Sequence, residues 1–203
     1  MFATLSGMNV PYRQIRAAYT EESITVYQAY DPAIATPAVA AQRFVAPFKR
    51  DRMTWIKPSF LWMMYRCGYA TKPGQTRVLA IDLTRDGFAW ALAHACLSHP
   101  DGDDDQEGWK ERLRHSPVRV QWDPERDPRH NTLPHRSIQI GLSGRAVDHY
   151  LDDWTLAITD ITDRVRDLHT ALRDHRDVTG LLPLERPYPV PEDLAQTIGA
   201  TTT

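Results

Sequence analysis

The chain has 203 residues, of which 42% are hydrophobic and 25% are charged. This length and composition are typical of one soluble domain with a substantial core. The formal net charge is −2 at pH 7, which excludes a protein whose whole surface binds nucleic acid through excess positive charge. No stretch reaches the roughly 20 apolar residues that a membrane-spanning helix requires, and the first twenty residues lack a signal-type apolar run, so we expect no membrane partner.

The cysteines and the charge distribution add two expectations. Cys67 and Cys96 are spaced like neither a disulfide framework nor a zinc site, which favours a reduced, cytoplasmic protein. Residues 43–77 hold eight cations and one acid, Asp51, whereas residues 101–107 hold five acids and no cation. The acidic run is typical of a solvated surface loop.

In the first half of the chain, the patterns predict helices and strands in alternation. Residues 13–19 are consistent with two helical turns, and residues 23–30 are rich in β-branched and aromatic residues, which predicts a strand. Residues 31–44 predict a helix, with Pro37 favourable in a first turn after Thr36. Another is expected from Pro58 to Gly68. Residues 76–84 predict a buried strand, followed by a helix for which Asp86 is the expected N-cap.

In the second half, two segments alternate between apolar and polar residues. Residues 117–123 and 136–142 each predict a strand with one buried face, and the twelve residues between them predict a long polar loop. Helices are expected at 108–115, 144–154 and 160–175, the last capped by Asp160. The proline-rich segment 181–203 is expected to run over the surface and end disordered.

Together these elements predict a single α+β domain over residues 10–190. We expect a mixed or antiparallel sheet of about four strands with five or six helices. Residues 1–9 and 191–203 are expected to be flexible tails.

Five phrases in the sequence are specific enough to indicate a family. They are "VYQAY", "RMTWIKPSFLWMMYR", "VQWDPER", "RSIQIGL" and "LPLERPYP". Together they resemble the domain-of-unknown-function family 4291, over about residues 10 to 190. The resemblance implies no established activity, and no catalytic residue is carried over from it.

The basic, aromatic stretch at residues 52–66 predicts a site for an anionic ligand. A helix begins with N–H groups that lack internal partners and carry partial positive charge. Lys57 and Ser59 at such a start, with Arg52 nearby, would bind a phosphate or a carboxylate. Arg66 adds a further cation, and Trp55 is placed to stack on a base. The alternative is a core helix whose Arg and Lys side chains extend from its ends into water.

The second candidate is the end of the strand at 117–123. Asp123 and Glu125 are candidates for acid–base catalysis or for electrostatic stabilisation of a transition state. Gln121 shares the polar face with Asp123, and Gln139 extends that face if the two alternating strands pair. The alternative is an Asp-Pro turn with a surface Glu–Arg pair. Glu185 is a weaker catalytic candidate.

Familiar signatures are absent from the sequence. The eight histidines are scattered without metal-ligand spacing, so no metal site is predicted. No dinucleotide fingerprint, P-loop or GxSxG motif occurs, and no cofactor is identified.

Three functions remain open at this point. The first is an enzyme acting on a nucleotide or another phosphate-bearing small molecule. One version is similar in residue order to ADP-ribosyltransferases, with Arg16 or Tyr27, then Ser59, then Glu125. The second is a non-catalytic module that binds nucleotides or nucleic acid, which the net charge does not favour. The third is a protein-interaction domain. The sequence indicates no oligomeric state.

Overall fold

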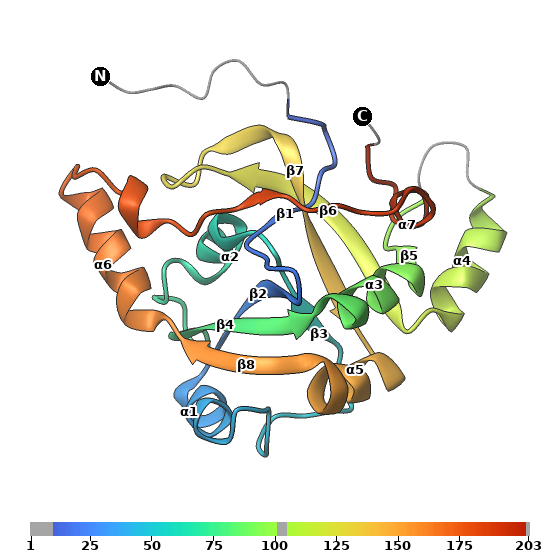
Figure 1. Cartoon of the computed structure of the whole chain (residues 1–203), viewed down its shortest axis with the longest axis horizontal. Coiled ribbons are helices and arrows are strands. Elements are labelled where there is room, and N and C mark those ends of the chain that lie inside the picture. Colours follow the sequence, from blue (N-terminus) through green and yellow to red (C-terminus); the bar gives the residue numbers. More distant parts are fainter. Residues whose placement is uncertain (1–9, 101–104, 202–203) are drawn as a thin grey trace.

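The computed structural model describes residues 10–100 and 105–201. Within these ranges the chain forms one α+β domain with seven α-helices and with strands in three sheets of four, three and two strands (Figure 1). The predicted fold class is therefore confirmed. Residues 1–9, expected to be a flexible tail, and residues 101–104 of the acidic run lie outside the described residues.

The three-stranded sheet is antiparallel, in the order β2-β4-β8. It consists of β2 (Ser23–Tyr30), β4 (Arg77–Thr84) and β8 (Thr155–Asp160). In Figure 1, α1 (Pro32–Ala41) lies along the β8 side and α6 (Thr162–Arg173) at one end of this sheet. Alternate residues of β2 such as Ile24 and Val26 are fully buried, as expected for a strand with one face in the core.

The four-stranded sheet has the order β3-β7-β6-β5. Its strands are β3 (Thr54–Ile56), β7 (Thr132–Leu142), β6 (Val118–Arg126) and β5 (Ala95–Leu97). The predicted alternation is realised, because Val120 and Ile140 are fully buried and pair across the strands, whereas Gln121 and Gln139 pair on the opposite face. The sheet therefore has one core face and one polar face.

The two larger sheets are joined where β2 meets the end of β3. The backbone N–H of Tyr27 donates to the carbonyl of Lys57 at 2.8 Å. Next to it, the buried Gln28 amide donates to Thr54 Oγ1 at 2.7 Å and to the Trp55 carbonyl at 3.0 Å. The Tyr150 hydroxyl completes the network by donating to Gln28 Oε1 at 2.7 Å. Because these groups are buried, their hydrogen bonds fix how the sheets meet.

The helix α2 (Phe60–Cys67) follows directly from this junction and was largely predicted. Ser59 is its N-cap and accepts a hydrogen bond from the Trp62 N–H at 3.1 Å. Gly68 ends the helix in a left-handed conformation with φ of 60°. Cys67 and Cys96 are both buried.

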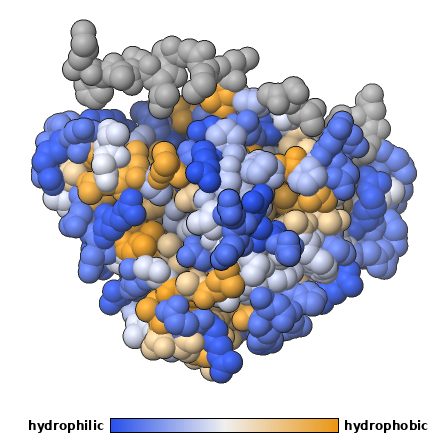
Figure 2. All heavy atoms as spheres, in the orientation of Figure 1, coloured by the Kyte–Doolittle hydropathy of each residue, from blue (hydrophilic) through white to orange (hydrophobic). Residues whose placement is uncertain are grey.

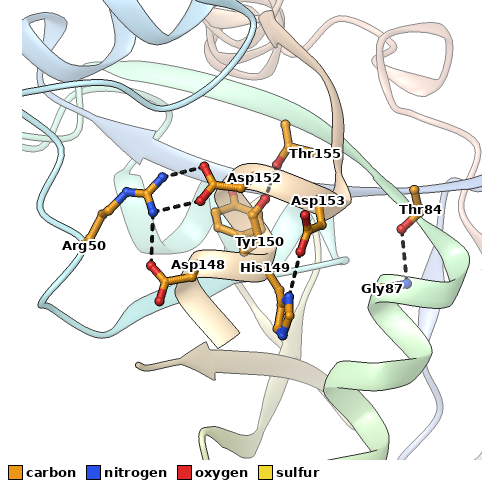
Figure 3. A network of polar contacts seen from close by, with 9 residues as sticks. All are labelled: Arg50, Thr84, Gly87, Asp148, His149, Tyr150, Asp152, Asp153 and Thr155. Atoms are coloured by element: carbon orange, nitrogen blue, oxygen red, sulfur yellow. Dashed lines mark hydrogen bonds and ion pairs between the residues drawn. The ribbon is translucent and has the colours of Figure 1, made fainter. Parts of the chain in front are cut away.

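The other elements enclose this core. They are α3 (Arg85–Ala93), α4 (Gln106–His115), α5 (Arg145–His149), α7 (Glu192–Thr197), β1 (Arg16–Ala17) and β9 (Arg186–Pro187). The helix α5 continues into a π-helical turn, Tyr150–Trp154, where Arg50 bridges Asp148 and Asp152 (Figure 3). The surface over α4 is mostly hydrophilic (Figure 2), in agreement with a helix that has no buried residue. No helix of the described residues combines the length and the apolar character needed to cross a membrane.

Three predictions near the N-terminus and α3 were wrong. Residues 13–19 contain the short strand β1, which pairs with β9 some 170 residues later, and local propensity gives no sign of such a partner. The helix α1 begins at Pro32, because Asp31 caps it by accepting from the Ala33 N–H. The helix α3 is capped by Thr84, which accepts from the Gly87 N–H at 3.1 Å (Figure 3), and not by Asp86.

The expected long loop at 124–135 is largely strand. β6 and β7 stay paired through a bulge after Pro124 as far as Arg126 and Thr132. Pro124 has no N–H to donate to a ladder, and a bulge is where a strand tolerates that loss. The C-terminal segment also differs from the expected extended tail, because it forms α7 and buries Ile198 completely.

The buried amide at the sheet junction yields a stability prediction. Truncation of Gln28 to Ala would leave the Tyr150 hydroxyl and Thr54 with fewer partners in the core, so we expect Gln28→Ala to lower the free energy of unfolding by about 2–4 kcal/mol. Urea unfolding measures this change. Gln196→Ala, on an exposed position of α7, is the matched control and should change stability by less than about 0.5 kcal/mol. Equal effects of the two substitutions would contradict the role given to Gln28.

Candidate functional site

Lys57 is a buried lysine at the edge of a small cavity. It follows β3, and only 7% of the residue is exposed. Its Nζ donates to the Trp55 carbonyl at 2.9 Å and lies 5.7 Å from the centre of the Trp62 ring. Together with Gln28, Trp55 and Arg66, it lines a cavity of about 230 Å³. Three residues predicted to bind a ligand therefore share one cavity.

The surroundings of Lys57 weaken its basicity. Burial lowers the pKa of the Lys57 amine to about 7, because the charged form loses its hydration. The positive charge of Arg66 lowers that pKa further, and the negative charge of Asp123 acts against both. At neutral pH the amine is therefore divided between its protonated and neutral forms.

Beside this cavity, the polar face of the four-stranded sheet holds Asp123 between two amides. Gln121 Nε2 donates to Asp123 Oδ1 at 2.8 Å, and Gln139 Nε2 donates to Asp123 Oδ2 at 2.6 Å. The two strands pair, which places all three side chains on one face. Ser137 lies opposite Asp123 in the register, and its buried hydroxyl has no hydrogen-bond partner within the described part of the chain.

Trp55 covers part of the same face. It is opposite Gly141 in the ladder, and a Cβ at Gly141 would come within 2.9 Å of the Trp55 ring. The glycine thus allows the indole to lie flat on β7, where it lines the cavity next to Lys57. The stacking of Trp55 on a ligand stays a prediction.

Glu125 is a buried carboxyl group that lies close to Ser59, in the turn that follows Lys57. It is 8% exposed, and its Oε1 accepts the Arg126 N–H at 2.8 Å. Burial raises the pKa of the Glu125 carboxyl. Hydrogen bonds from the Arg126 N–H and the Ser59 hydroxyl oppose that rise, as does the positive charge of Arg16. The segments 57–59 and 123–125 therefore lie close together, but Glu125 is not among the residues lining the Lys57 cavity.

Glu185 occupies the start of α2. Its Oε1 accepts the Phe60 N–H at 2.7 Å, and burial raises its pKa to about 8, with the negative charge of Glu125 adding to the rise. The Phe60 hydrogen bond acts in the opposite direction. The first N–H of this helix is thus bonded to an internal carboxyl group, where the sequence predicted a free position for a ligand anion. Ser59 is buried and serves as the cap.

Of the remaining candidate residues, Arg16 and Tyr27 lie near the site and Arg52 lies outside it. Arg16 lies near the carboxylates of Glu125 and Glu185, and its Nη2 donates to the Glu185 carbonyl at 3.3 Å. Tyr27 is buried beside Phe60, and burial raises the pKa of its hydroxyl. Arg52 does not join the site, because it is exposed and lines a different cavity.

Sequence reasoning missed two residues that shape the site. Gln28 lies in "VYQAY", where an amide among apolar strand residues is the available signal for a buried hydrogen-bond network. Gly141 lies in "IQIGL", where a glycine inside a strand marks a close approach of another group. Neither signal identifies the partner, because Trp55 and Tyr150 come from distant parts of the chain.

One family model matches most of the chain. The family model described as a domain of unknown function, DUF4291, matches residues 14–188. A search of curated proteins found no match. Within residues 10–100 and 105–201, no group of three or more His, Cys, Asp or Glu side chains is arranged to hold a metal ion.

Glu185 yields a prediction about pH. A carboxyl whose pKa is higher in the folded chain than in the unfolded chain stabilises the fold most below its ordinary value of 4.5, and that stability is lost as pH rises toward about 8. We expect Glu185→Gln to flatten this decline between pH 5 and pH 8, measured by urea unfolding. Glu192→Gln, on exposed α7, should retain the decline. A slope that Glu185→Gln leaves unchanged would contradict the burial of this carboxyl.

Proposed function

The chain belongs to the DUF4291 family, and we propose that it is an enzyme that binds a nucleotide-like, phosphate-bearing substrate and acts at the ribosyl carbon. The observation that carries the proposal is the contact between Ser59 and Glu125, with Arg16 beside the same carboxylate. These residues are far apart in the sequence, and their order alone suggested the likeness to ADP-ribosyltransferases. Their convergence gives that likeness a physical basis.

Glu125 would stabilise the charge that develops when a glycosidic bond breaks. In the proposed reaction, the base of the nucleotide leaves with the electron pair of the carbon–nitrogen bond, and the ribosyl carbon becomes an oxocarbenium ion. A carboxylate in a water-poor site stabilises such a cation far better than one in bulk water. A hydroxyl or water then adds to this carbon and releases its proton.

The cavity beside Lys57 would receive the phosphate-bearing part of the substrate. The planar guanidinium of Arg66 matches phosphate geometry. A bound phosphate would favour the protonated form of Lys57, because an opposite charge nearby favours the charged state. Trp55 lines the cavity on the sheet side and offers an aromatic face to a base.

The alternative functions receive less support. Binding of nucleic acid needs free cations along one surface. In the basic stretch 43–77, Arg50 is ion-paired with Asp148 and Asp152, Arg77 is ion-paired with Asp160, and Lys57 is buried.

A protein-interaction domain needs a contiguous apolar patch. The large hydrophobic residues that are exposed in the described part of the chain lie in separate segments. They are Tyr12, Tyr65, Leu156 and Leu184. A cytoplasmic location is also part of the proposal, and it fits a buried Cys67 that is not in a disulfide bond.

The role of Glu125 is tested with NAD as the probe substrate. We expect the wild-type protein to release nicotinamide from NAD at millimolar concentration and Glu125→Gln to lower that rate at least about 100-fold. Chromatographic measurement of nicotinamide checks this, with Glu192→Gln as the control that retains activity. NAD should raise the melting temperature of all three proteins, because it binds only the folded state. If the wild-type protein shows no nicotinamide release and no thermal shift, the proposal is contradicted.

The phosphate-binding role of the cavity has its own pH signature. Lys57 carries its charge below about pH 7 and loses it above, so we expect the KM for NAD to rise as pH increases through 7. Arg66→Gln should raise KM by about 10-fold through the loss of one charge-assisted contact. Arg66→Gln also removes the positive charge that lowers the pKa of Lys57. The rise in KM should therefore move to a higher pH in this variant. Steady-state kinetics at several pH values measures both effects, and a KM that is insensitive to pH and to Arg66→Gln would place the phosphates elsewhere.

A further inference from the structure

We propose that Lys57 is a reactive amine that forms an imine with small carbonyl compounds bearing an anionic group. This inference goes beyond the proposed function and does not require it, because it concerns the neutral amine in the cavity and not the carboxylate of Glu125. It rests on the hydrogen bonds of Lys57, on its cationic neighbour and on the size of the cavity.

The hydrogen bonds around Lys57 suit a neutral amine. An ammonium group has three N–H donors, all of which need acceptors when the group is buried. Within the described residues, the Trp55 carbonyl at 2.9 Å is the one acceptor hydrogen-bonded to Nζ, and no carboxylate lies within ion-pair distance. An amine that donates one hydrogen bond to Trp55 keeps its lone pair for other chemistry.

The electrostatic surroundings of Lys57 also favour the neutral amine. Burial is the main cause that lowers the pKa of Lys57 to about 7, and the adjacent Arg66 is the second. A desolvated lysine next to another cation is the combination by which proteins make an amine nucleophilic at neutral pH. Asp123 is close enough to favour the charged form partly, so the amine remains able to accept a proton.

The cavity selects the class of ligand. Its volume of about 230 Å³ is below the range of about 300–1,000 Å³ that is typical of sites for drug-sized molecules. The guanidinium of Arg66 lines it and would pair with a carboxylate or phosphate on the ligand. The preferred ligand is therefore an aldehyde or ketone of few carbons that carries one such anionic group.

The chemical step is balanced without a cofactor. The Nζ lone pair attacks the carbonyl carbon, and the electron pair of the carbon–oxygen π bond moves to oxygen, which takes up a proton while the nitrogen loses one. The resulting carbinolamine expels its hydroxyl group as water, with one further proton taken up by oxygen and one released by nitrogen. A carbon–nitrogen double bond to Lys57 remains.

Reductive trapping with glyoxylate tests the inference. Glyoxylate is a small aldehyde that carries a carboxylate, and cyanoborohydride delivers a hydride to the imine carbon, which leaves a stable carboxymethyl group on the amine. Peptide mass spectrometry locates that group. The other three lysines of the chain, Lys49, Lys72 and Lys110, are exposed and provide internal references in the same sample.

We expect Lys57 to be modified at least about 10-fold faster than each reference lysine at pH 7, despite its burial. The rate at Lys57 should level off just above pH 7, whereas a lysine of ordinary basicity continues to gain neutral amine up to about pH 10. A rate at Lys57 no higher than at the references, or one that keeps rising to pH 10, would overturn the inference. This comparison uses the wild-type protein alone, so it does not depend on whether a variant folds.

Variants separate the contributions. Lys57→Met should abolish the fast phase of modification. Arg66→Gln should slow trapping of glyoxylate more than trapping of acetaldehyde, which has no anionic group, and equal slowing of both would contradict the ligand class. Glu192→Gln, at an exposed position, should leave trapping unchanged. Trapping is measured without NAD, so failure of imine formation and failure of the proposed ribosyl chemistry give different results.

Discussion

The positions of Trp55, Lys57 and Ser59 depend on how the two larger sheets are joined. The N–H of Tyr27 in β2 bonds to the carbonyl of Lys57, and the Gln28 amide bonds to Thr54 and to the Trp55 carbonyl. These bonds fix the backbone at the end of β3, where the chain turns through Pro58 into α2. The turn sends the Lys57 side chain toward the polar face of β6 and β7 and brings Ser59 against Glu125.

Burial at this junction brings the pKa values of one acid and one base close to neutral pH. The pKa of Lys57 falls to about 7 and that of Glu185 rises to about 8, in both cases chiefly because the charged form loses water. Groups with such values are suited to exchange protons at physiological pH. They belong to opposite sides of the same turn, since Lys57 faces the cavity and Glu185 is bonded to the Phe60 N–H at the start of α2. Perturbed groups gathered in this way are typical of functional sites.

Local chemistry explains what could be predicted from the sequence. The end of α2 follows from Gly68, and the polar face that carries Gln121, Asp123 and Gln139 follows from alternation along two strands. The partners of these groups could not be predicted in the same way. Glu185 reaches the start of α2 from 125 residues away, and β1 is a strand only because β9 pairs with it. The bulge after Pro124 likewise turned an expected loop into paired strand, because tertiary pairing outweighed the local loop signal.

A crystal structure of the protein with ADP-ribose tests the central claim most directly, because it places phosphate and ribose in one experiment. The account predicts the pyrophosphate against Arg66 and Lys57, with the anomeric carbon of the terminal ribose turned toward Glu125. ADP-ribose bound instead in another cavity, such as that lined by Arg112 and Arg145, would contradict it.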